Sequence, residues 1–362
     1  MPAFDDFLKA FPDYQRTRRI DALRSSEYRR LDLQHHVYLD YTGGGLHAES
    51  QVREHTALLN NRVLGNPHSV SLTSSAMTDL VERTRRAVLA WFNAEGGYTA
   101  IFTQNATAAL KHVGESYPFG PRGRYLLSTD NHNSVNGIRE FAAARGAAVA
   151  YVPLTTPELR MDRDRLRGLL EEASTSANNL FAFPAQSNFS GVKHPLEIIK
   201  EAHDRGWDVL LDAAAFVPTS RLDLDAVRPD FVSVSFYKMF GYPTGVGCLL
   251  VRNSALRKLH RPWFAGGTVN FASVEGRCHI LAPGEAGFED GTLNYLAIPA
   301  VEIGLRHLDT IGIDTIQARV RCLTEWLLQS LLELRHTNGR PMVRIYGPLT
   351  SAARGGIVTM NF

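Results

Sequence analysis

One lysine, Lys238, stands in a sequence context that suggests chemistry. It follows the apolar segment FVSVSF (231–236) and has Ser235 and Tyr237 close by. A Gly- and Pro-rich turn comes next, before another apolar segment, GCLLVR (247–252). A lysine at such a strand end either extends into solvent or lies in a pocket, where a desolvated amine becomes a nucleophile.

Two further residues have types that would complement a reactive amine. Asp212 ends the apolar segment DVLLD and is followed by three alanines. A carboxylate there either caps a helix or faces a ligand nitrogen and keeps it protonated, and the alanines leave room for a flat group. His132, in TDNHNS, is either an ordinary polar residue or a residue whose imidazole ring stacks on an aromatic ligand.

The segment TQNATAAL (103–110) has the composition of a phosphate-binding turn before a helix. Free amides at a helix N-terminus bind phosphate, and Thr107 adds a hydroxyl. The alternative is an ordinary N-cap by Asn105. A site for pyridoxal 5'-phosphate needs four parts. They are a lysine amine, a carboxylate that pairs with the ring nitrogen, an aromatic side chain that stacks on the ring, and a phosphate-binding site.

The elements that must position these residues alternate along the chain. Amphipathic segments such as 77–93 and 195–206 lie between short apolar ones. This alternation predicts an α/β fold, in which a mostly parallel sheet is covered by helices on both faces. We expect its strands at residues 36–41, 98–103, 124–129, 147–153, 179–184, 207–213, 231–236 and 247–252.

Ligands of such sheets bind beyond the carboxyl ends of the strands. Polar residues cluster at five predicted strand ends, so we expect these clusters to meet on one rim. They are residues 103–107, 130–132, 186–188, 212–215 and 235–238.

The pattern changes near residue 295, which predicts a second, smaller domain. We expect an N-terminal helical segment at 1–35, a large domain at 36–295 and a small α+β domain at 296–362. The small domain is predicted to hold a helical region followed by short strands at 342–347 and 355–361.

Composition narrows the classes of function. The 362-residue chain has a formal net charge of +2, which gives no basic footprint for nucleic acid. It has no apolar run near the roughly 20 residues of a membrane span, and no apolar signal-peptide core at its N-terminus. Three cysteines are too few for a disulfide framework or a zinc knuckle. We therefore expect a cytoplasmic enzyme without nucleic-acid, membrane or metal partners.

Several motifs resemble those of the class V aminotransferase family, fold type I, which includes cysteine desulfurases. Within it, the chain is most similar to the pyridoxal-phosphate domain of molybdenum cofactor sulfurases. The motifs follow the family's order from about residue 37 to about 300. They are YLDYTGGGLHAESQV, NPHSVS, FTQNATAAL, DNHNSV, QSNFSGVKHPLE, LLDAAAFVPTS, VSFYKMFGYPTGVGCLLVR, FAGGTV and FEDGTLNY.

The resemblance implies a role for each matching position around pyridoxal 5'-phosphate. Lys238 would form the Schiff base, and Asp212 would pair with the pyridine nitrogen. His132 would stack on one face of the ring and Ala214 on the other. Asn188 would contact the ring hydroxyl or the substrate carboxylate.

The remaining implied roles concern the cofactor's phosphate. Ala106, Thr107 and Ser235 would hold it. Thr292, in FEDGTLN, would reach the phosphate of a neighbouring subunit, which implies a homodimer.

The chain departs from many desulfurases at the site. Tyr237 and Ala215 stand where many of them carry His and Gln, and both suit the molybdenum cofactor sulfurase pattern. The family's persulfide cysteine lies on a loop after a strand resembling GGIVTMNF (355–362), where this sequence stops. The resemblance therefore implies that the small domain is incomplete.

The three cysteines lie elsewhere in the sequence. Cys248 and Cys322 are expected on regular elements with a structural role. Cys278 is expected on a loop near the mouth of the site.

Three functions remain open from the sequence. The first is cleavage of the carbon–sulfur bond of a cysteine-like amino acid. The second is transamination, racemisation or another elimination, with Lys238 again moving the proton. The third is a non-catalytic scaffold subunit, against which the intact set of Lys238, Asp212 and His132 argues.

Overall fold

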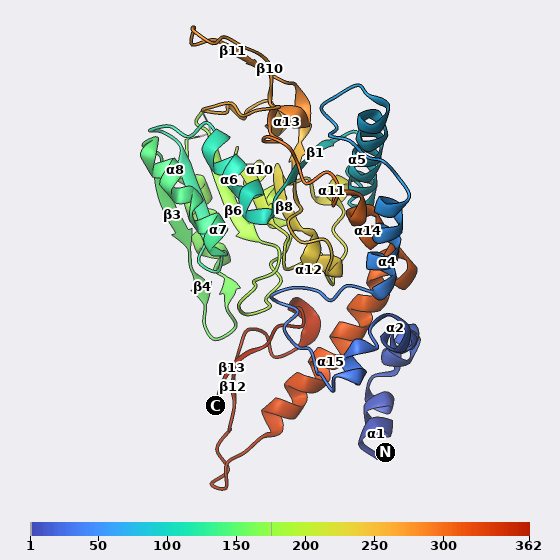
Figure 1. Ribbon diagram of the computed structural model, residues 1–362. Helices are drawn as coiled ribbons and strands as arrows, with labels where there is room; N and C mark the ends of the chain where they lie inside the picture. Colours follow the sequence, from blue (N-terminus) through green and yellow to red (C-terminus); the bar gives the residue numbers. More distant parts are fainter. Residues whose placement is uncertain (1, 175) are drawn as a thin grey trace.

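A seven-stranded sheet forms the centre of the computed structural model, which describes residues 2–174 and 176–362 (Figure 1). The strand order is β1-β9-β8-β7-β6-β2-β3. Only β9 runs antiparallel to its neighbours among these seven, so the predicted mostly parallel sheet is confirmed. The strands are β1 (Tyr98–Thr103), β2 (Arg124–Ser128), β3 (Ala148–Val152), β6 (Asn179–Pro184), β7 (Asp208–Asp212), β8 (Phe231–Ser235) and β9 (Gly247–Arg252).

Both faces of the sheet are buried, which explains why the strands are apolar without alternation. All six positions of β6 are buried. Phe181 and Phe183 belong to the core on one face, and Leu180 and Ala182 belong to the core on the other.

Helices cover the two faces and supply the other half of each core. The first face is covered by α5 (Leu72–Trp91), α9 (Arg163–Glu171), α10 (Ile198–His203), α11 (Leu224–Val227) and α14 (Pro299–Ile311). The second face is covered by α6 (Ala106–Ser116), α7 (Asn133–Asn136), α8 (Ile138–Ala144) and α13 (Asn253–Leu256).

The N-terminal helical segment and α15 lie side by side below the sheet (Figure 1). Arg319 on α15 (Ile313–Glu333) donates hydrogen bonds to Thr17 and Asp21 of the N-terminal segment. That segment comprises α1 (Pro2–Ala10), η1 (Pro12–Thr17), α2 (Arg19–Glu27) and α3 (Arg30–Leu33), and α4 (Glu49–Asn60) follows.

The last part of the chain forms the two short strands expected there. β12 (Arg344–Tyr346) pairs antiparallel with β13 (Thr359–Asn361), and η3 (Ser351–Ala353) lies between them. A small separate core gathers around Leu328 and Ile345. The domain boundaries given above stay a prediction.

The remaining short elements lie at the edges of the molecule. β4 (Leu154–Thr155) pairs with β5 (Arg160–Met161), and η2 (Gly284–Gly287) precedes the FEDGT segment. β10 (Val269–Ala272) and β11 (His279–Leu281) form a hairpin that projects from the body (Figure 1).

One expected strand, 36–41, is wrong. These residues form no ladder, and Val37 and Leu39 are exposed. A strand needs a partner for its amides and carbonyls, and here the chain turns at once through Gly43–Gly45. The amide of Gly45 donates to the carbonyl of Tyr237, so the segment passes beside Lys238 instead of joining the sheet.

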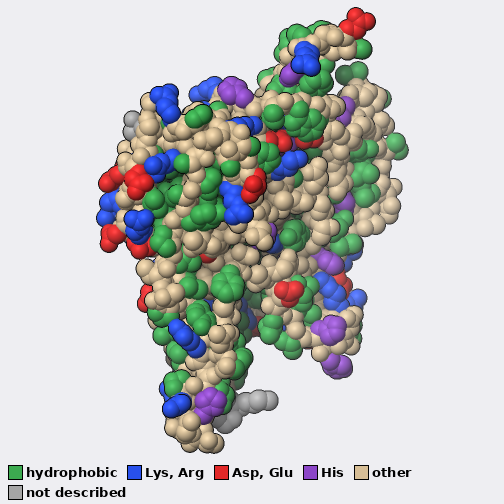
Figure 2. Space-filling view, turned by 90° about the vertical axis from the view of Figure 1, so that its left-hand side faces the viewer, with side chains coloured by type: hydrophobic (Ala, Val, Ile, Leu, Met, Phe, Trp, Pro, Cys, Tyr) green, Lys and Arg blue, Asp and Glu red, His purple; other side chains and the backbone are tan. Residues whose placement is uncertain are grey.

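Charged side chains of both signs share the surface of the molecule. Figure 2 shows acidic and basic side chains interspersed over the face that carries β3 and α8. Within residues 2–174 and 176–362, no helix combines the length and the apolar character that crossing a membrane requires.

Candidate active site

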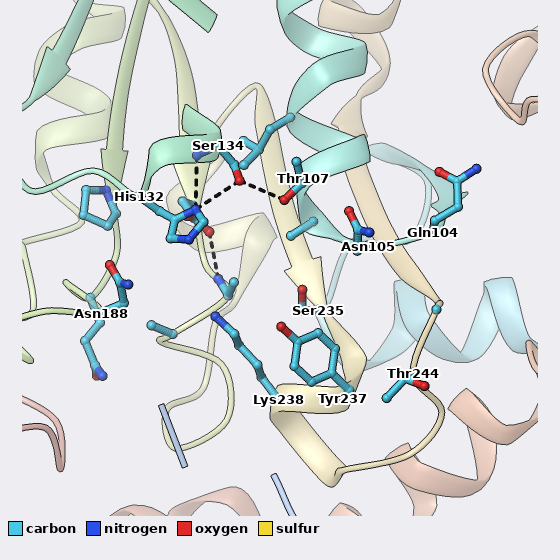
Figure 3. A pocket seen from close by; sticks show the side chains of 18 residues that line it. Gln104, Asn105, Thr107, His132, Ser134, Asn188, Ser235, Tyr237, Lys238 and Thr244 are labelled. Carbon is cyan, nitrogen blue, oxygen red and sulfur yellow. Dashed lines mark hydrogen bonds between the residues drawn. The ribbon is translucent and has the colours of Figure 1, made fainter. Parts of the chain in front are cut away.

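A cavity of about 410 Å³ opens at the carboxyl ends of the central strands (Figure 3). All five polar clusters contribute to its wall. Of the nine site residues named from the sequence, eight line it and Thr292 does not. The eight are Ala106, Thr107, His132, Asn188, Asp212, Ala214, Ser235 and Lys238.

Lys238 reaches the cavity from a very short helix, α12 (Phe236–Phe240), that follows β8. Phe236 and Phe240 stack on each other and are buried in the core, so Lys238, midway between them, faces the pocket. The helix ends at Gly241, whose φ of 80° suits a residue without a side chain. Figure 3 shows the Lys238 amine extending into the cavity, on the side of His132.

Asp212 presents one carboxylate oxygen to the cavity and uses the other structurally. Its Oδ1 atom accepts hydrogen bonds from the amide of Ala214 at 3.1 Å and from Ser233 Oγ at 3.0 Å. Among the described residues, Oδ2 has no hydrogen-bond partner, although the side chain is buried. An unpaired carboxylate oxygen on a residue that lines the cavity fits a protonated ring nitrogen.

His132 is held in one orientation by Ser134. Its Nδ1 atom accepts a hydrogen bond from the amide of Ser134 at 3.1 Å, so a neutral ring carries its proton on Nε2. Ser134 Oγ lies 3.0 Å from the same Nδ1 and 2.8 Å from Thr107 Oγ1. The three side chains therefore form a chain from the end of β2 to the start of α6 (Figure 3).

The N-terminus of α6 is both capped and open to a ligand. Asn105 Oδ1 accepts from the amide of Ala108 at 2.9 Å, which is the ordinary N-cap. The amides of Ala106 and Thr107 have no partner within a helix at these positions, and both residues line the cavity. The N-cap by Asn105 and a phosphate-binding role for this segment are therefore compatible. The free amides of Ala106 and Thr107 fit a phosphate.

Gly247 allows this helix end to lie against the sheet. A Cβ atom on Gly247 would lie 2.6 Å from the carbonyl carbon of Asn105 and 2.9 Å from the amide nitrogen of Ala106. Both neighbours are backbone atoms, so they have no rotamer by which to move away. Glycine at the start of β9 thus sets the position of the phosphate-binding amides.

Several lining residues had no role assigned from the sequence, although Gln186, Ala215 and Tyr237 belong to the strand-end clusters expected on the rim. Gln186 is 4% exposed and belongs to the wall of the cavity. The only sequence signal for Ser134 as a site residue is its place in the DNHNS segment beside His132. Thr244 and Gly245 line the cavity from the turn after Lys238. Tyr237 and Ala215, at which the chain departs from many desulfurases, also line the cavity.

Thr292 does not line the cavity of its own chain. It is exposed, and its Oγ1 atom is 3.5 Å from Asn66 Nδ2.

The three cysteines are absent from the pocket wall. Cys248 is fully buried in β9, where desolvation raises the pKa of its thiol. Burial also raises the pKa of Cys322 on α15. Cys278 is exposed on the projecting β10–β11 hairpin, so its expected place near the mouth of the site is corrected.

Comparison with known proteins gives a consistent result. Residues 37–362 match the family model described as aminotransferase class-V. The chain is 37% identical to the molybdenum cofactor sulfurase of Solanum lycopersicum, covering 99% of this chain and 48% of that protein. It is 39% identical to the molybdenum cofactor sulfurase of Homo sapiens, covering 94% of this chain and 40% of that protein. The chain thus spans about half the length or less of these relatives.

Solved structures share the fold at lower identity. The cysteine desulfurase from Thermococcus onnurineus NA1 has a TM-score of 0.78 at 24% identity, covering 94% of this chain and 82% of that one. The cystine C–S lyase C-DES, in complex with its product cysteine persulfide, has a TM-score of 0.71 at 21% identity. That match covers 88% of this chain and 82% of the lyase chain.

Proposed function

Because the chain belongs to the class V aminotransferase family, we propose that it cleaves the carbon–sulfur bond of a sulfur-containing amino acid such as L-cysteine. The family match confirms the enzyme class and the cofactor, pyridoxal 5'-phosphate, that the sequence predicts. The observation that carries the proposal is the meeting of Lys238, the free Oδ2 of Asp212 and the open end of α6 around one cavity.

The residues present fit this cofactor. The amides of Ala106 and Thr107, with Ser235, would hold the phosphate, and Asp212 would hold a proton on the ring nitrogen. His132 and Ala214 line the same cavity and would flank the ring. Asn188 would contact the ring hydroxyl or the substrate carboxylate.

The bound cofactor supplies an electron sink for the bonds at the α-carbon of the amino acid. Lys238 would take the proton from that carbon, because its amine extends into the cavity from α12. Asp212 would direct Oδ2 at the ring nitrogen, since Ala214 and Ser233 already donate to Oδ1. The cavity wall would limit water at the reacting carbon.

The choice of a sulfur-containing substrate rests on the relatives. Relatives at 37% and 39% identity are molybdenum cofactor sulfurases, and one protein of the same fold is a cystine C–S lyase.

Transamination or another elimination is the second candidate. It is favoured by the cysteines, since Cys248 and Cys322 are buried and Cys278 lies on the projecting hairpin. Desulfuration through a persulfide on one of these thiols would require a reach that none of them has in this structure.

We further propose a homodimer in the cytoplasm. Thr292 lies outside its own cavity, as expected if it serves the partner's phosphate. The projecting hairpin carries exposed apolar side chains, Phe271, Val274 and Ile280, that a second subunit would cover. Sedimentation should give a dimer at all concentrations that retain the cofactor. A monomer that binds pyridoxal phosphate tightly would contradict this proposal.

Product analysis tests the proposed reaction. The purified protein is loaded with pyridoxal phosphate and incubated with L-cysteine and a thiol reductant, with Lys238→Ala as the control. Alanine and sulfide indicate desulfuration, whereas pyruvate, ammonia and sulfide indicate elimination, and either supports carbon–sulfur cleavage. Conversion of the cofactor to its amine form without sulfide would instead establish transamination.

A further inference from the structure

A buried aspartate–histidine pair lies behind the wall of the cavity. His194 Nε2 donates a hydrogen bond to Asp130 Oδ2 at 2.8 Å, and the exposed fractions of the two side chains are 1% and 4%. Ser128 Oγ donates to the other oxygen of Asp130 at 2.7 Å. Neither Asp130 nor His194 lines the cavity, so the pair can influence a ligand there only through other residues.

Each member of the pair belongs to a segment that carries one of the proposed site residues. Asp130 lies in the turn after β2, two residues before His132, which is the N-cap of α7. His194 lies in a short hairpin after β6, and its amide closes the base of this hairpin by donating to the carbonyl of Ala185 at 3.1 Å. Asn188 lies near the tip of the same hairpin.

The side-chain hydrogen bond links these two segments directly. Among the described residues, no other hydrogen bond joins residues 129–132 to residues 185–194. Movement at the link is restricted, because both partners are buried and the ring of His194 packs edge-on against Phe183 of the core. Separation of the segments would leave a buried carboxylate oxygen unpaired, which is costly.

The two site residues depend on this placement of their backbones. Among the described residues, the ring of His132 hydrogen-bonds only to Ser134, two positions along the same turn. The side chain of Asn188 makes no hydrogen bond to the other described residues that line the cavity (Figure 3). The position of each side chain therefore follows the segment that carries it.

We propose that Asp130 and His194 are positioning residues, whose hydrogen bond holds His132 and Asn188 at the separation that suits the ring of pyridoxal phosphate. This inference rests on the proposed function, because it takes His132 and Asn188 as residues that surround the ring. It gives a role to two residues outside the cavity wall.

His194→Phe tests the proposal, because it keeps an aromatic ring against Phe183 and removes the donor to Asp130. Pyridoxal phosphate is titrated into the protein, and binding is read from the absorbance and the visible circular dichroism of the cofactor. The variant should weaken cofactor binding about 10-fold or more and change the dichroism, as expected when a hydrogen bond to a charged group is lost. His194→Gln, whose carboxamide can donate to Asp130, should restore most of the affinity.

The double variant Asp130→Leu/His194→Phe separates position from stability. Replacing both partners by apolar side chains removes the unpaired buried oxygen, so the unfolding temperature should recover toward the wild-type value. Cofactor affinity should stay low, because the two segments are no longer linked. Recovery of both quantities would show that the pair serves stability alone and would overturn the inference.

His203→Phe is the matched control. His203 Nε2 donates to Oδ2 of the buried Asp230, also at 2.8 Å. Asp230 directly precedes β8, at the edge of the sheet opposite the cavity. This variant should lower the unfolding temperature and leave cofactor affinity and dichroism unchanged. Equal losses of affinity in His203→Phe and His194→Phe would reject a role specific to the site.

A His132→Ala/Asn188→Ala background tests the route of the effect. There His194→Phe should change cofactor affinity little, because its effect passes through these two residues. A loss as large as in the wild-type background would overturn the inference and leave the proposed function intact. A wild-type protein that binds pyridoxal phosphate but cleaves no carbon–sulfur bond would reject the proposed reaction and leave this inference standing. A wild-type protein that does not bind the cofactor would reject both.

Discussion

Ser233 Oγ donates to Oδ1 of Asp212 at 3.0 Å, although the two residues lie on different strands, β8 and β7. Together with the amide of Ala214, this bond holds one carboxylate oxygen in place. Oδ2 is left without a partner among the residues that the structure describes and can bind a ligand in the cavity. The orientation of the Asp212 carboxylate therefore depends on both β7 and β8.

The first prediction concerns that charge. Asp212→Asn should reduce turnover about 10- to 150-fold, because a charge-assisted hydrogen bond is worth about 1.5–3 kcal/mol. Cofactor occupancy should fall much less, since the phosphate contacts remain. Turnover and occupancy are measured on the same preparation, with Ser233→Ala as a variant that keeps the charge. Equal losses in both quantities would indicate only a binding or folding role.

The second prediction identifies the reactive amine. Borohydride reduction of the cofactor-loaded protein should fix the cofactor to Lys238, and peptide mass spectrometry should locate it there. Lys193 is the demanding control, because burial lowers the pKa of its amine and so increases the neutral, nucleophilic fraction. Lys193→Ala should keep the label and Lys238→Ala should lose it. A label on Lys193 in the wild-type protein would reject the assignment.

The third prediction tests how α6 is positioned. Gly247→Ala should weaken pyridoxal phosphate binding about 10-fold or more and destabilise the fold by about 1–3 kcal/mol, because the added methyl group would force the backbone at Asn105 to move. Cofactor titration and thermal unfolding measure the two effects.

Gly168→Ala is the control for this substitution. A Cβ atom there meets nothing within 4 Å, and the residue lies inside α9, where alanine is favoured over glycine. It should bind the cofactor normally and unfold at the same or a higher temperature. Normal cofactor affinity in Gly247→Ala would show that the close approach is unimportant for the phosphate.

The fourth prediction concerns sulfur carried on the protein. Incubation of the chain with L-cysteine should add no sulfur atom to Cys248 or Cys322, since burial raises the pKa of both thiols and the thiolate is the nucleophile. Cys278 is accessible but lies outside the cavity wall, so it should also stay unmodified. Intact-protein mass spectrometry provides the measurement. A sulfur adduct that disappears in Cys278→Ser would make the hairpin a sulfur carrier.

The sequence predicted much of the sheet because its strands are buried on both faces and therefore read as continuous apolar segments. Residues 179–184 were placed in this way, and β6 has the same bounds. Residues 36–41 have a similar apolar pattern, but they form no strand, so that prediction is wrong. Pairing with another strand is not encoded locally, and the glycines that follow turn the chain toward α12.

Local residue patterns were enough to predict the chemical groups of the site. Lys238, Asp212 and the segment before α6 each follow a predicted strand, and the carboxyl ends of parallel strands meet on one edge of the sheet. Which atoms of these groups are free to bind a ligand follows from contacts in the folded chain. Ser233 occupies one oxygen of Asp212, Ser134 contacts Thr107 of α6, and Gly355, over 160 residues from Gln186, packs on its carboxamide. Such contacts depend on distances between segments remote in the chain, which local residue patterns do not specify.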